Sequence, residues 1–325
     1  MSQKRVFLIG YFSSGNVGDD RLLGQSKQIV WTRYPGAEIR YLAARTAGQG
    51  VGRWSILKLM FTIFRSEHVV FSGGSLFQNQ TSHRSFYYYC TLLCMAIFSG
   101  ATVTFLGQGI GPIQGWLANT VLNMLLPFVH LLHLRDVDSY ERVLGHVEMP
   151  VLGRDLVFYR ASLQQKLGCR LGINLRPGVF SKGVELGVRA LYSSEERPIF
   201  LSFSDQDDVI LDDWGLGRAE GVWDMAQAWD SDEPRIGLLV GMRLHACIWA
   251  ALKGVPFIAL SYDPKVTAFA RSAGQYVLDA YTVTQDQFLE ALLCVRADYS
   301  RYQQSLLAMV QDAQVDMRDL ERLLV

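Results

Sequence analysis

Short apolar runs alternate with longer amphipathic stretches along the first half of the chain. Residues 5–10 form an apolar run typical of a strand, and a glycine-rich loop follows it to residue 20. A helix is predicted at about 20–33, because Tyr34-Pro35-Gly36 is a strong signal for the end of a helix. The same alternation predicts strands at 38–42, 66–71, 101–106 and 130–135, and helices at 54–64, 85–98 and 115–126. This order indicates a mainly parallel, doubly wound sheet.

The pattern lapses between residues 155 and 170 and starts again with a predicted strand at 171–176. Further strands are predicted at 198–203, 235–240 and 256–261, and helices at 218–229, 244–253, 264–273 and 284–322. We therefore expect two Rossmann-like α/β domains facing each other across a cleft, residues 1–165 at the N-terminal side and residues 166–325 at the C-terminal side. The last helix is able to pack back on the first domain.

Composition excludes several classes of protein. Half of the 325 residues are hydrophobic and 19% are charged, which favours a large folded core over disorder. Lys+Arg and Asp+Glu both number 31, so there is no basic surplus and we expect no nucleic-acid partner. The five cysteines are scattered, with no Cys-x-x-Cys pair, and the N-terminal apolar run is too short for a signal peptide. We therefore expect a cytoplasmic protein without a metal site.

Residues 85–134 contain no Asp, Glu, Lys or Arg. The apolar run at 86–106 has the length of a membrane span, but Ser99-Gly100 interrupts it and the β-branched residues after it favour a strand. Buried parallel strands and their covering helices are often apolar throughout, so we expect buried core here. A peripheral contact at the inner face of the membrane stays open, because apolar surface near a site can meet a lipid-linked substrate.

Three glycine-rich loops directly follow predicted strands. The first, at 10–20, places Asp19 and Asp20 near a helix start, where a carboxylate serves either as a helix cap or as a functional group. The other two are Ser-Gly-Gly-Ser-Leu-Phe-Gln-Asn at 72–79 and Gly-Gln-Gly-Ile-Gly-Pro at 107–112. Glycine permits tight turns and close ligand approach, and parallel strands end at one edge of a sheet. We therefore expect a shared ligand-binding rim.

Cations and a histidine follow the predicted strands of the second half. Arg243 and His245 lie in Gly-Met-Arg-Leu-His-Ala at 241–246, where a strand changes to an apolar helix. Arginine offers a planar fork for a carboxylate or phosphate, and histidine exchanges a proton near neutral pH. Arg176 and Lys265 follow two other predicted strands. The pattern predicts an anion site, and the alternative for His245 is a buried core residue.

In order along the chain, the motifs GNVGDD, GGSLFQN, GQGIGP, RD..S, GMRLHA and SYDPK resemble those of the polysaccharide pyruvyl transferase family, in particular its CsaB-like members. The resemblance implies a glycosyltransferase-B-like (GT-B-like) fold. It implies transfer of pyruvate from phosphoenolpyruvate to two hydroxyls of a sugar, which gives a pyruvate ketal and phosphate, with no cofactor. The implied acceptor is a sugar or lipid-linked oligosaccharide of a cell-surface polysaccharide or its precursor.

The resemblance also implies roles for residues of this chain. Phosphoenolpyruvate carries a carboxylate and a phosphate, so its pocket needs fixed cations, and Arg176, Arg243 and Lys265 are the candidates. His245 is the candidate acid for the methylene carbon of the donor, and Asp19 is the second catalytic candidate, on the acceptor side. Candidates for the acceptor and its loops are Asn16, Gly73, Gly74, Gln78, Gln108 and Gly109.

Two positions depart from the family pattern. Where GGGLFQD is expected, this chain has Ser75 and Asn79, and the second change removes a charge. Two alternatives therefore stay open: a glycosyltransferase that uses a nucleotide-sugar donor, and a catalytically silent homologue that acts as a subunit in polysaccharide assembly. The cations after residue 241 argue against the first, and the intact Arg243 and His245 argue against the second.

Overall fold

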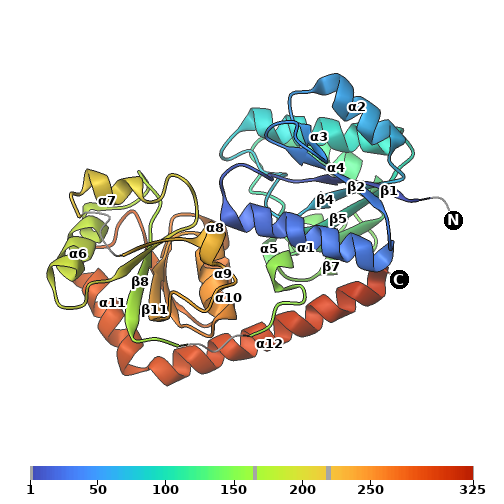
Figure 1. Cartoon of the computed structure of the whole chain (residues 1–325). Helices are drawn as coiled ribbons and strands as arrows, with labels where there is room; N and C mark the ends of the chain where they lie inside the picture. The colour runs from blue at the N-terminus through green and yellow to red at the C-terminus, as the bar shows by residue number, and fades with distance from the viewer. Residues whose placement is uncertain (1–2, 164–166, 217–220, 325) are drawn as a thin grey trace. The chain divides into compact units, whose positions relative to one another are not determined.

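Figure 1 shows a computed structural model of the chain, which describes residues 3–163, 167–216 and 221–324. The chain folds as two compact units. Unit 1 comprises Met1–Arg160 and Ala313–Val325, and unit 2 comprises Ala161–Asp312. The domain boundary expected between residues 165 and 166 lies outside the described residues. The last helix, α12 (Tyr299–Leu324), begins in unit 2 and ends in unit 1.

Unit 1 contains a seven-stranded sheet in the order β3-β2-β1-β4-β5-β6-β7. Its strands are β1 (Arg5–Ile9), β2 (Glu38–Ala43), β3 (Gly50–Gly52), β4 (His68–Ser72), β5 (Thr102–Gln108), β6 (Leu131–Leu134) and β7 (Val151–Leu152). Every neighbouring pair is parallel. The chain reverses its direction across the sheet between β1 and β4, and ligands of doubly wound sheets bind outside the strand ends at such a point.

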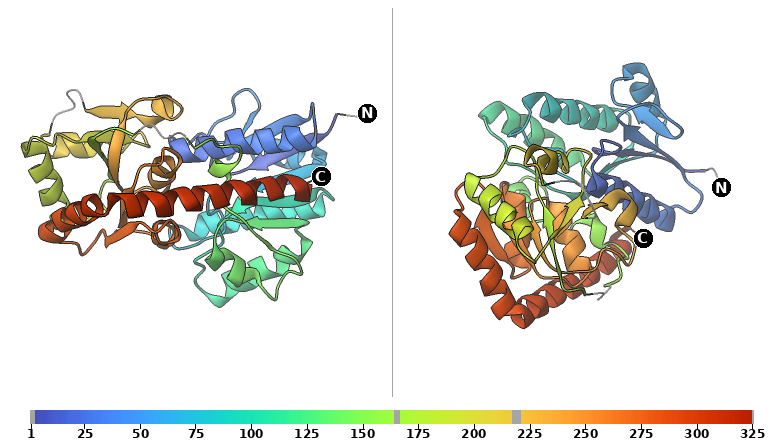
Figure 2. Two further views of the ribbon diagram at one scale, coloured as in Figure 1. Left: turned by 90° about the horizontal axis from the view of Figure 1, so that it is seen from below. Right: turned by 60° about the vertical axis from the view of Figure 1, so that its left-hand side comes forward.

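The helices of unit 1 cover both faces of this sheet. They are α1 (Val17–Arg33), α2 (Ile56–Arg65), α3 (His83–Phe98), α4 (Trp116–Leu125) and α5 (Val137–Val143), with short 3-10 helices η1 (Leu126–Phe128) and η2 (Leu156–Phe158). α2 and α3 lie on one face, and α1 and the C-terminal part of α12 lie on the other (Figures 1 and 2). Among the described residues, no helix has both the length and the hydropathy to cross a bilayer.

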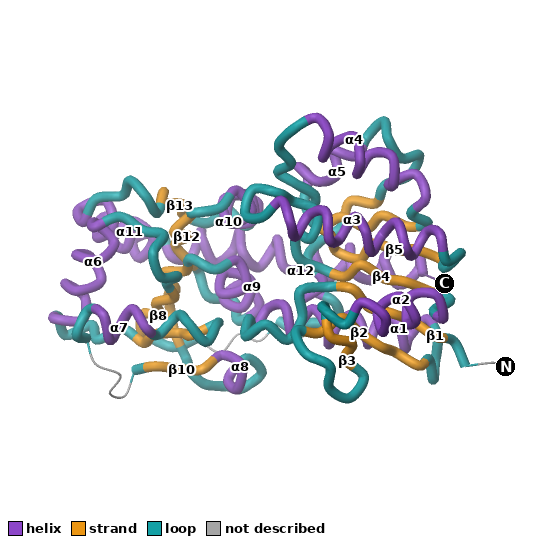
Figure 3. Tube along the Cα trace, turned by 90° about the horizontal axis from the view of Figure 1, so that it is seen from above, coloured by secondary structure: helices purple, strands orange, loops and turns teal. Residues whose placement is uncertain are grey.

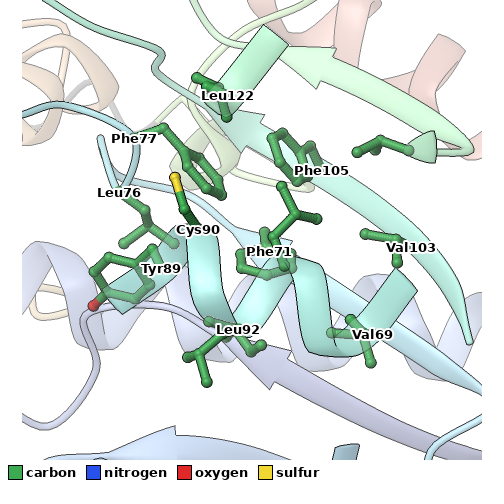
Figure 4. Close-up of a cluster of buried hydrophobic side chains, with 14 of the residues drawn as sticks. Val69, Phe71, Leu76, Phe77, Tyr89, Cys90, Leu92, Val103, Phe105 and Leu122 are labelled. Carbon is green, nitrogen blue, oxygen red and sulfur yellow. The ribbon is translucent and has the colours of Figure 1, made fainter. Parts of the chain in front are cut away.

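The core of unit 1 confirms the expectation for the uncharged stretch. Phe71 on β4 and Phe105 on β5 have ring centroids 5.3 Å apart, and Phe77 stacks on Phe105 at 4.9 Å. Cys90 of α3 and Leu122 of α4 are buried in the same cluster (Figure 4). The stretch thus supplies a central strand and two helices packed against it. Its exposed large apolar side chains include Phe98, Trp116, Leu117, Met124 and Phe128.

Unit 2 repeats the same topology with six parallel strands in the order β10-β9-β8-β11-β12-β13. The strands are β8 (Arg170–Asn174), β9 (Ile199–Ser202), β10 (Val222–Asp224), β11 (Ile236–Gly241), β12 (Phe257–Ser261) and β13 (Tyr276–Asp279). The helices are α6 (Lys182–Ser193), α7 (Val209–Asp213), α8 (Met225–Ala228), α9 (Leu244–Leu252), α10 (Pro264–Ser272) and α11 (Gln285–Ala297). The point of reversal here lies between β8 and β11.

Two predicted helices of the second half are wrong in extent. The helix predicted at 218–229 begins with residues 218–220, which lie outside the described residues, and beyond them Val222–Asp224 is a strand that pairs with β9. Only Met225–Ala228 is helical there. The helix predicted at 284–322 is two helices, because α11 ends at Ala297 and Asp298 forms its C-cap. In both cases tertiary pairing or packing overrides the local preference.

Candidate functional site

The structure brings the four predicted residues of the second half to one edge of the unit 2 sheet. Arg176 follows β8, Arg243 follows β11, and Lys265 lies in the first turn of α10 after β12. His245 is the second residue of α9, directly after β11. Because β8, β11 and β12 are neighbours, these side chains share the carboxyl edge that includes the reversal between β8 and β11. We call these four residues the cationic rim.

A buried carboxylate fixes the orientation of the Arg243 guanidinium. Asp207, whose side chain is fully buried, accepts hydrogen bonds from Nε of Arg243 at 2.8 Å and from its Nη2. The Asn174 amide donates to Asp207 at 3.1 Å and accepts the backbone N–H of Arg243 at 3.0 Å. Burial raises the pKa of the Asp207 carboxyl, while the hydrogen bonds from Arg243, the Phe203 N–H and Asn174 act in the opposite direction. The Arg243 guanidinium is therefore preorganised.

The sequence did not single out Asp207 or Asn174 as site residues. Asp207 belongs to an acidic group with Asp205 and Asp208, and only its contact with Arg243 distinguishes it from these neighbours. Asn174 is the last residue of β8, and a buried asparagine at a strand end was the available signal. Both residues act through Arg243, so they are positioning residues.

The other two cations are more accessible. Arg176 is exposed, and its guanidinium lies over the ring of Tyr262, 5.1 Å from the ring centroid. The Nζ of Lys265 lies 3.2 Å from a carboxylate oxygen of Asp263, which also caps α10 by accepting the backbone N–H of Lys265 at 3.1 Å. His245 is buried, in the first turn of α9, next to the N-cap residue Arg243. The cationic rim thus combines one fixed guanidinium with two accessible cations.

In unit 1, the loops after β1 and β4 meet at the reversal of the sheet. Asn16 is the N-cap of α1 and accepts the N–H of Gly18 at 3.0 Å, so neither aspartate caps this helix. Asp20 instead accepts the N–H of Ser13 at 2.8 Å. A Cβ added at Gly74, whose φ is +70°, would lie 4.0 Å from Oδ1 of Asp19. Asp19 therefore stands beside the glycine turn after β4.

The loops after β4 and β5 are tied together by several predicted residues. Gln108 is buried and donates to the carbonyl of Gly73 at 2.6 Å, while the N–H of Gly109 donates to the carbonyl of Gly74 at 2.7 Å. Gln78 accepts the N–H of Thr81 at 3.2 Å within its own loop. Gln108, Gly109 and Gln78 therefore shape the loops, and Asn16 and Asp19 are the predicted acceptor-side residues that lie beside them.

The residues that depart from the family pattern have structural partners. The hydroxyl of Ser75 accepts a hydrogen bond from Nη2 of Arg135 at 2.8 Å, and Nη1 of Arg135 lies 3.2 Å from Asp155. Asn79 is buried, accepts the N–H of Gln114 at 2.7 Å and donates to its carbonyl at 2.7 Å. Both residues that depart from the family pattern thus make hydrogen bonds that tie the loops to other segments.

The motif RD..S serves the same loops. Besides the contacts of Arg135, Asp136 caps α5 by accepting the N–H of Ser139 at 2.8 Å. The hydroxyl of Ser139 accepts the N–H of Ile110 at 2.8 Å and fixes the loop after β5. The sequence analysis placed Arg135 in a motif without giving it a role. The structure shows that Arg135 links the loop after β4 to Asp155 through its contacts with Ser75 and Asp155.

A buried histidine supports the turn that begins this loop. His133 on β6 accepts the N–H of Gly107 through Nδ1 at 3.0 Å. Burial lowers the pKa of His133 to about 4, so the imidazole is neutral at physiological pH.

The described residues contain no group of three or more His, Cys, Asp or Glu side chains arranged to hold a metal ion.

Comparisons with known proteins agree with this geometry. The sequence model of the family described as polysaccharide pyruvyl transferase matches residues 16–214. A spinosyn rhamnosyltransferase superposes with a TM-score of 0.60 at 11% identity, covering 99% of each chain. The UDP-GlcNAc 2-epimerase from Neisseria meningitidis gives a TM-score of 0.57 at 10% identity, covering 98% of this chain and 99% of that one. These likenesses show a GT-B-like fold of two Rossmann-like units. No curated protein matches the sequence significantly.

Proposed function

Because the chain belongs to the polysaccharide pyruvyl transferase family, we propose that it transfers pyruvate from phosphoenolpyruvate to two hydroxyls of a sugar. The acceptor is a cell-surface polysaccharide or its precursor, free or lipid-linked, and the products are a pyruvate ketal and phosphate. The reaction uses no cofactor besides the donor substrate. The described cysteines are all free thiols, which supports assignment to the cytoplasm.

The cationic rim is the observation that carries this proposal. The donor presents a carboxylate and a phosphate, and a planar guanidinium binds either group through two parallel hydrogen bonds. Arg243 is held by Asp207 before any ligand arrives, so little freedom is lost on binding. Arg176 and Lys265 supply the further positive charge that a doubly anionic donor requires.

His245 is the proposed acid. Proton transfer from its imidazolium to the methylene carbon converts that carbon into a methyl group and leaves an oxocarbenium-like centre at the neighbouring carbon. The first sugar hydroxyl adds to this centre, and the neutral imidazole takes the hydroxyl proton. The second hydroxyl then replaces the phosphate at the same carbon, and the proton of that hydroxyl leaves with the phosphate or through a base. Arg243 stabilises the departing phosphate.

The loops of unit 1 are the proposed acceptor site. Asp19 and Asn16 stand at the reversal between β1 and β4, and Gly73 and Gly74 permit close approach of a sugar ring. Asp19 is the proposed base for an acceptor hydroxyl. The carboxylate and amide offer the acceptor and donor groups that sugar hydroxyls need.

The test is a thermal-shift titration with phosphoenolpyruvate. A ligand that binds only the native state stabilises it by about 2.7 kcal/mol at a hundredfold excess over its Kd. Wild type is compared with Arg243→Ala, which removes a charge-assisted contact of about 1.5–3 kcal/mol. Arg235→Ala is the matched control. Arg235 is half-exposed and lies directly before β11, whereas Arg243 follows the other end of this strand.

We expect phosphoenolpyruvate to stabilise wild type and Arg235→Ala, and to have little effect on Arg243→Ala. Stabilisation by UDP in place of phosphoenolpyruvate would contradict the proposal and favour a nucleotide-sugar donor. Equal stabilisation of all three variants by phosphoenolpyruvate would remove Arg243 from the donor site.

A further inference from the structure

The helix α2 is apolar on both of its sides. Its inner side packs on the core through Leu59 and Ile63, which are buried. Its outer side carries Leu57, Met60, Phe61 and Phe64 at the spacing i, i+3, i+4, i+7, which places them on one stripe of a helix. Their exposed fractions are 82%, 43%, 57% and 55%. We call these four residues the α2 stripe, and a helix face of this kind normally packs on a core.

Other apolar side chains extend this exposed surface. The helices α2, α3 and α4 lie over the same face of the unit 1 sheet (Figure 3). Large apolar side chains are exposed on and around all three: Trp54, Ile56, Phe98, Trp116, Leu117, Met124 and Phe128. Soluble proteins rarely expose so many large apolar groups on one face unless the face binds something.

The charged residues of α2 and α3 are all basic. Residues 39–134 contain six Lys or Arg and a single acid, Glu67, although the whole chain has a net charge of zero. Glu67 is paired with Lys4 at 2.8 Å. Lys58 and Arg65 are exposed on α2 beside the stripe, and Arg84 is exposed in the first turn of α3. Neither α2 nor α3 contains an acidic residue, so the exposed apolar side chains of these two helices stand beside cations. Such a surface is complementary to a layer of lipid acyl chains with anionic headgroups.

We propose that this face of unit 1 binds the surface of an anionic membrane, with the α2 stripe at the boundary of headgroups and acyl chains. Lys58, Arg65 and Arg84 contact lipid phosphates. Tryptophan and phenylalanine are typical of such interfacial contacts. The proposed contact is peripheral, because the stripe lies along the surface of a helix that also packs on the core of unit 1. The inference is independent of the donor chemistry proposed above.

The test is sedimentation of the full chain with lipid vesicles. Vesicles of phosphatidylcholine alone are compared with vesicles that contain about 30% phosphatidylglycerol, a composition chosen to approach the anionic surface of a cytoplasmic leaflet. The variant Leu57→Glu/Phe61→Glu places two charges in the stripe at exposed positions, where folding is little affected. Leu293→Glu/Leu323→Glu is the matched control, because these side chains are 67% and 53% exposed on α11 and α12.

We expect wild type and the control to bind the anionic vesicles, and Leu57→Glu/Phe61→Glu to bind at least tenfold less. A triple change of Lys58, Arg65 and Arg84 to Gln is expected to reduce binding to the level seen with phosphatidylcholine. The proposal is overturned if wild type stays in the supernatant, or if the stripe variant binds like the control. It is also overturned if wild type is a dimer that the stripe variant converts to a monomer, without vesicle binding, because a second copy would then cover the face.

Phosphoenolpyruvate stabilisation, measured on the same variants, separates this proposal from the proposed function. The α2 stripe and the control positions lie outside the cationic rim. A stripe variant that keeps its donor response and loses vesicle binding supports the membrane contact alone. If phosphoenolpyruvate does not stabilise wild type, the proposed reaction is overturned, whereas the membrane proposal is still decided by the vesicle-binding result.

Discussion

Arg243 and Asn79 show how single side chains take their roles from distant partners. Asp207, separated from Arg243 by 36 positions in the sequence, directs the guanidinium. The Asn79 side chain closes a loop through two hydrogen bonds to the backbone of Gln114, one that it donates and one that it accepts. Burying a polar group costs little free energy of folding when all of its hydrogen bonds are made. Removing one partner of a buried hydrogen bond leaves the remaining group unsatisfied and destabilises the protein.

Asn79→Asp is expected to destabilise the protein, although it restores the aspartate of the family pattern. The new carboxylate cannot donate to the carbonyl of Gln114, which would cost about 1–3 kcal/mol at neutral pH. Gln80→Glu makes the same amide-to-acid change at the next, exposed position and should be neutral. Urea denaturation measures both. Equal stability of the two variants would show that the hydrogen bond to Gln114 contributes nothing.

Stability is expected to fall between pH 7 and pH 5 because of His133. The pKa of this group is about 4 in the native state and about 6.5 in the unfolded state, so the unfolded state binds the proton first as pH falls. The stabilisation is complete above pH 6.5, and about 2 kcal/mol of it is lost by pH 5. His133→Asn keeps an acceptor for the N–H of Gly107 and should lack this part of the pH dependence. Free energies of unfolding at both pH values give the comparison, and identical slopes would contradict it.

His245→Gln is expected to lower turnover with phosphoenolpyruvate more than donor affinity. A group that transfers a proton acts in the transition state, and its loss typically reduces the rate by about 100- to 10,000-fold. The readouts are phosphate release and the thermal shift with phosphoenolpyruvate. If turnover stays at the wild-type level, His245 is a buried core residue of α9 and has no part in proton transfer.

At the scale of elements, the start of α1 combines a structural and a proposed functional role in one side chain. Asn16 caps the helix by accepting the N–H of Gly18, and it also stands in the proposed acceptor site. The two roles make different demands, because a cap needs only a side-chain acceptor whereas a sugar hydroxyl also uses the amide as a donor. Substitution can therefore separate them.

Asn16→Ala is expected to cost about 1 kcal/mol of stability, and Asn16→Asp is expected to cost almost none, because aspartate is an equally good cap. If the amide also contacts the acceptor, Asn16→Asp loses transfer to the sugar while keeping its melting temperature and its response to phosphoenolpyruvate. Full transfer activity in Asn16→Asp would restrict Asn16 to capping. Thermal denaturation and an assay of ketal formation distinguish these results.

At the scale of the whole molecule, the chain returns to its first unit at the end. Residues from Ala313 onward belong to unit 1, where Met317 and Leu320 are buried and Asp316 pairs with Arg154 at 3.0 Å. The last turns of α12 therefore complete the packing of a unit that begins more than 300 residues earlier. Unit 1 is therefore built from two separate segments of the chain.

Met317→Ala is expected to destabilise unit 1 by about 2–5 kcal/mol, as truncation of a buried methionine does. Leu323→Ala is the control on the same helix, since Leu323 is half-exposed and its loss should change stability by less than about 0.5 kcal/mol. Hydrogen exchange in β1 and β4 measures the stability of unit 1 directly. Unchanged exchange in Met317→Ala would mean that the end of α12 does not stabilise this sheet.

Local patterns in the sequence were enough to predict most of the strands and helices and the two sets of loops at their ends. Hydrophobic periodicity and turn residues are local properties, so the strands at 5–10 and 38–42 and the loops at 72–79 and 107–112 were predicted without a structure. The doubly wound topology followed from the order of these elements, and the parallel sheets of both units confirm it.

The polar contacts that hold the site residues in place could not be predicted from the sequence and are seen in the folded chain. The pairs Asp207–Arg243, Asn79–Gln114 and Ser75–Arg135 join residues far apart in sequence, and no local pattern records such a contact. The edge strand β10 was also not predictable from local sequence, because it forms by pairing with β9. Nor could the sequence show which side of α2 is exposed, because both sides are apolar and only one of them packs on the core. Pairing and burial are properties of the folded chain, because they depend on which segments the sheet order brings together.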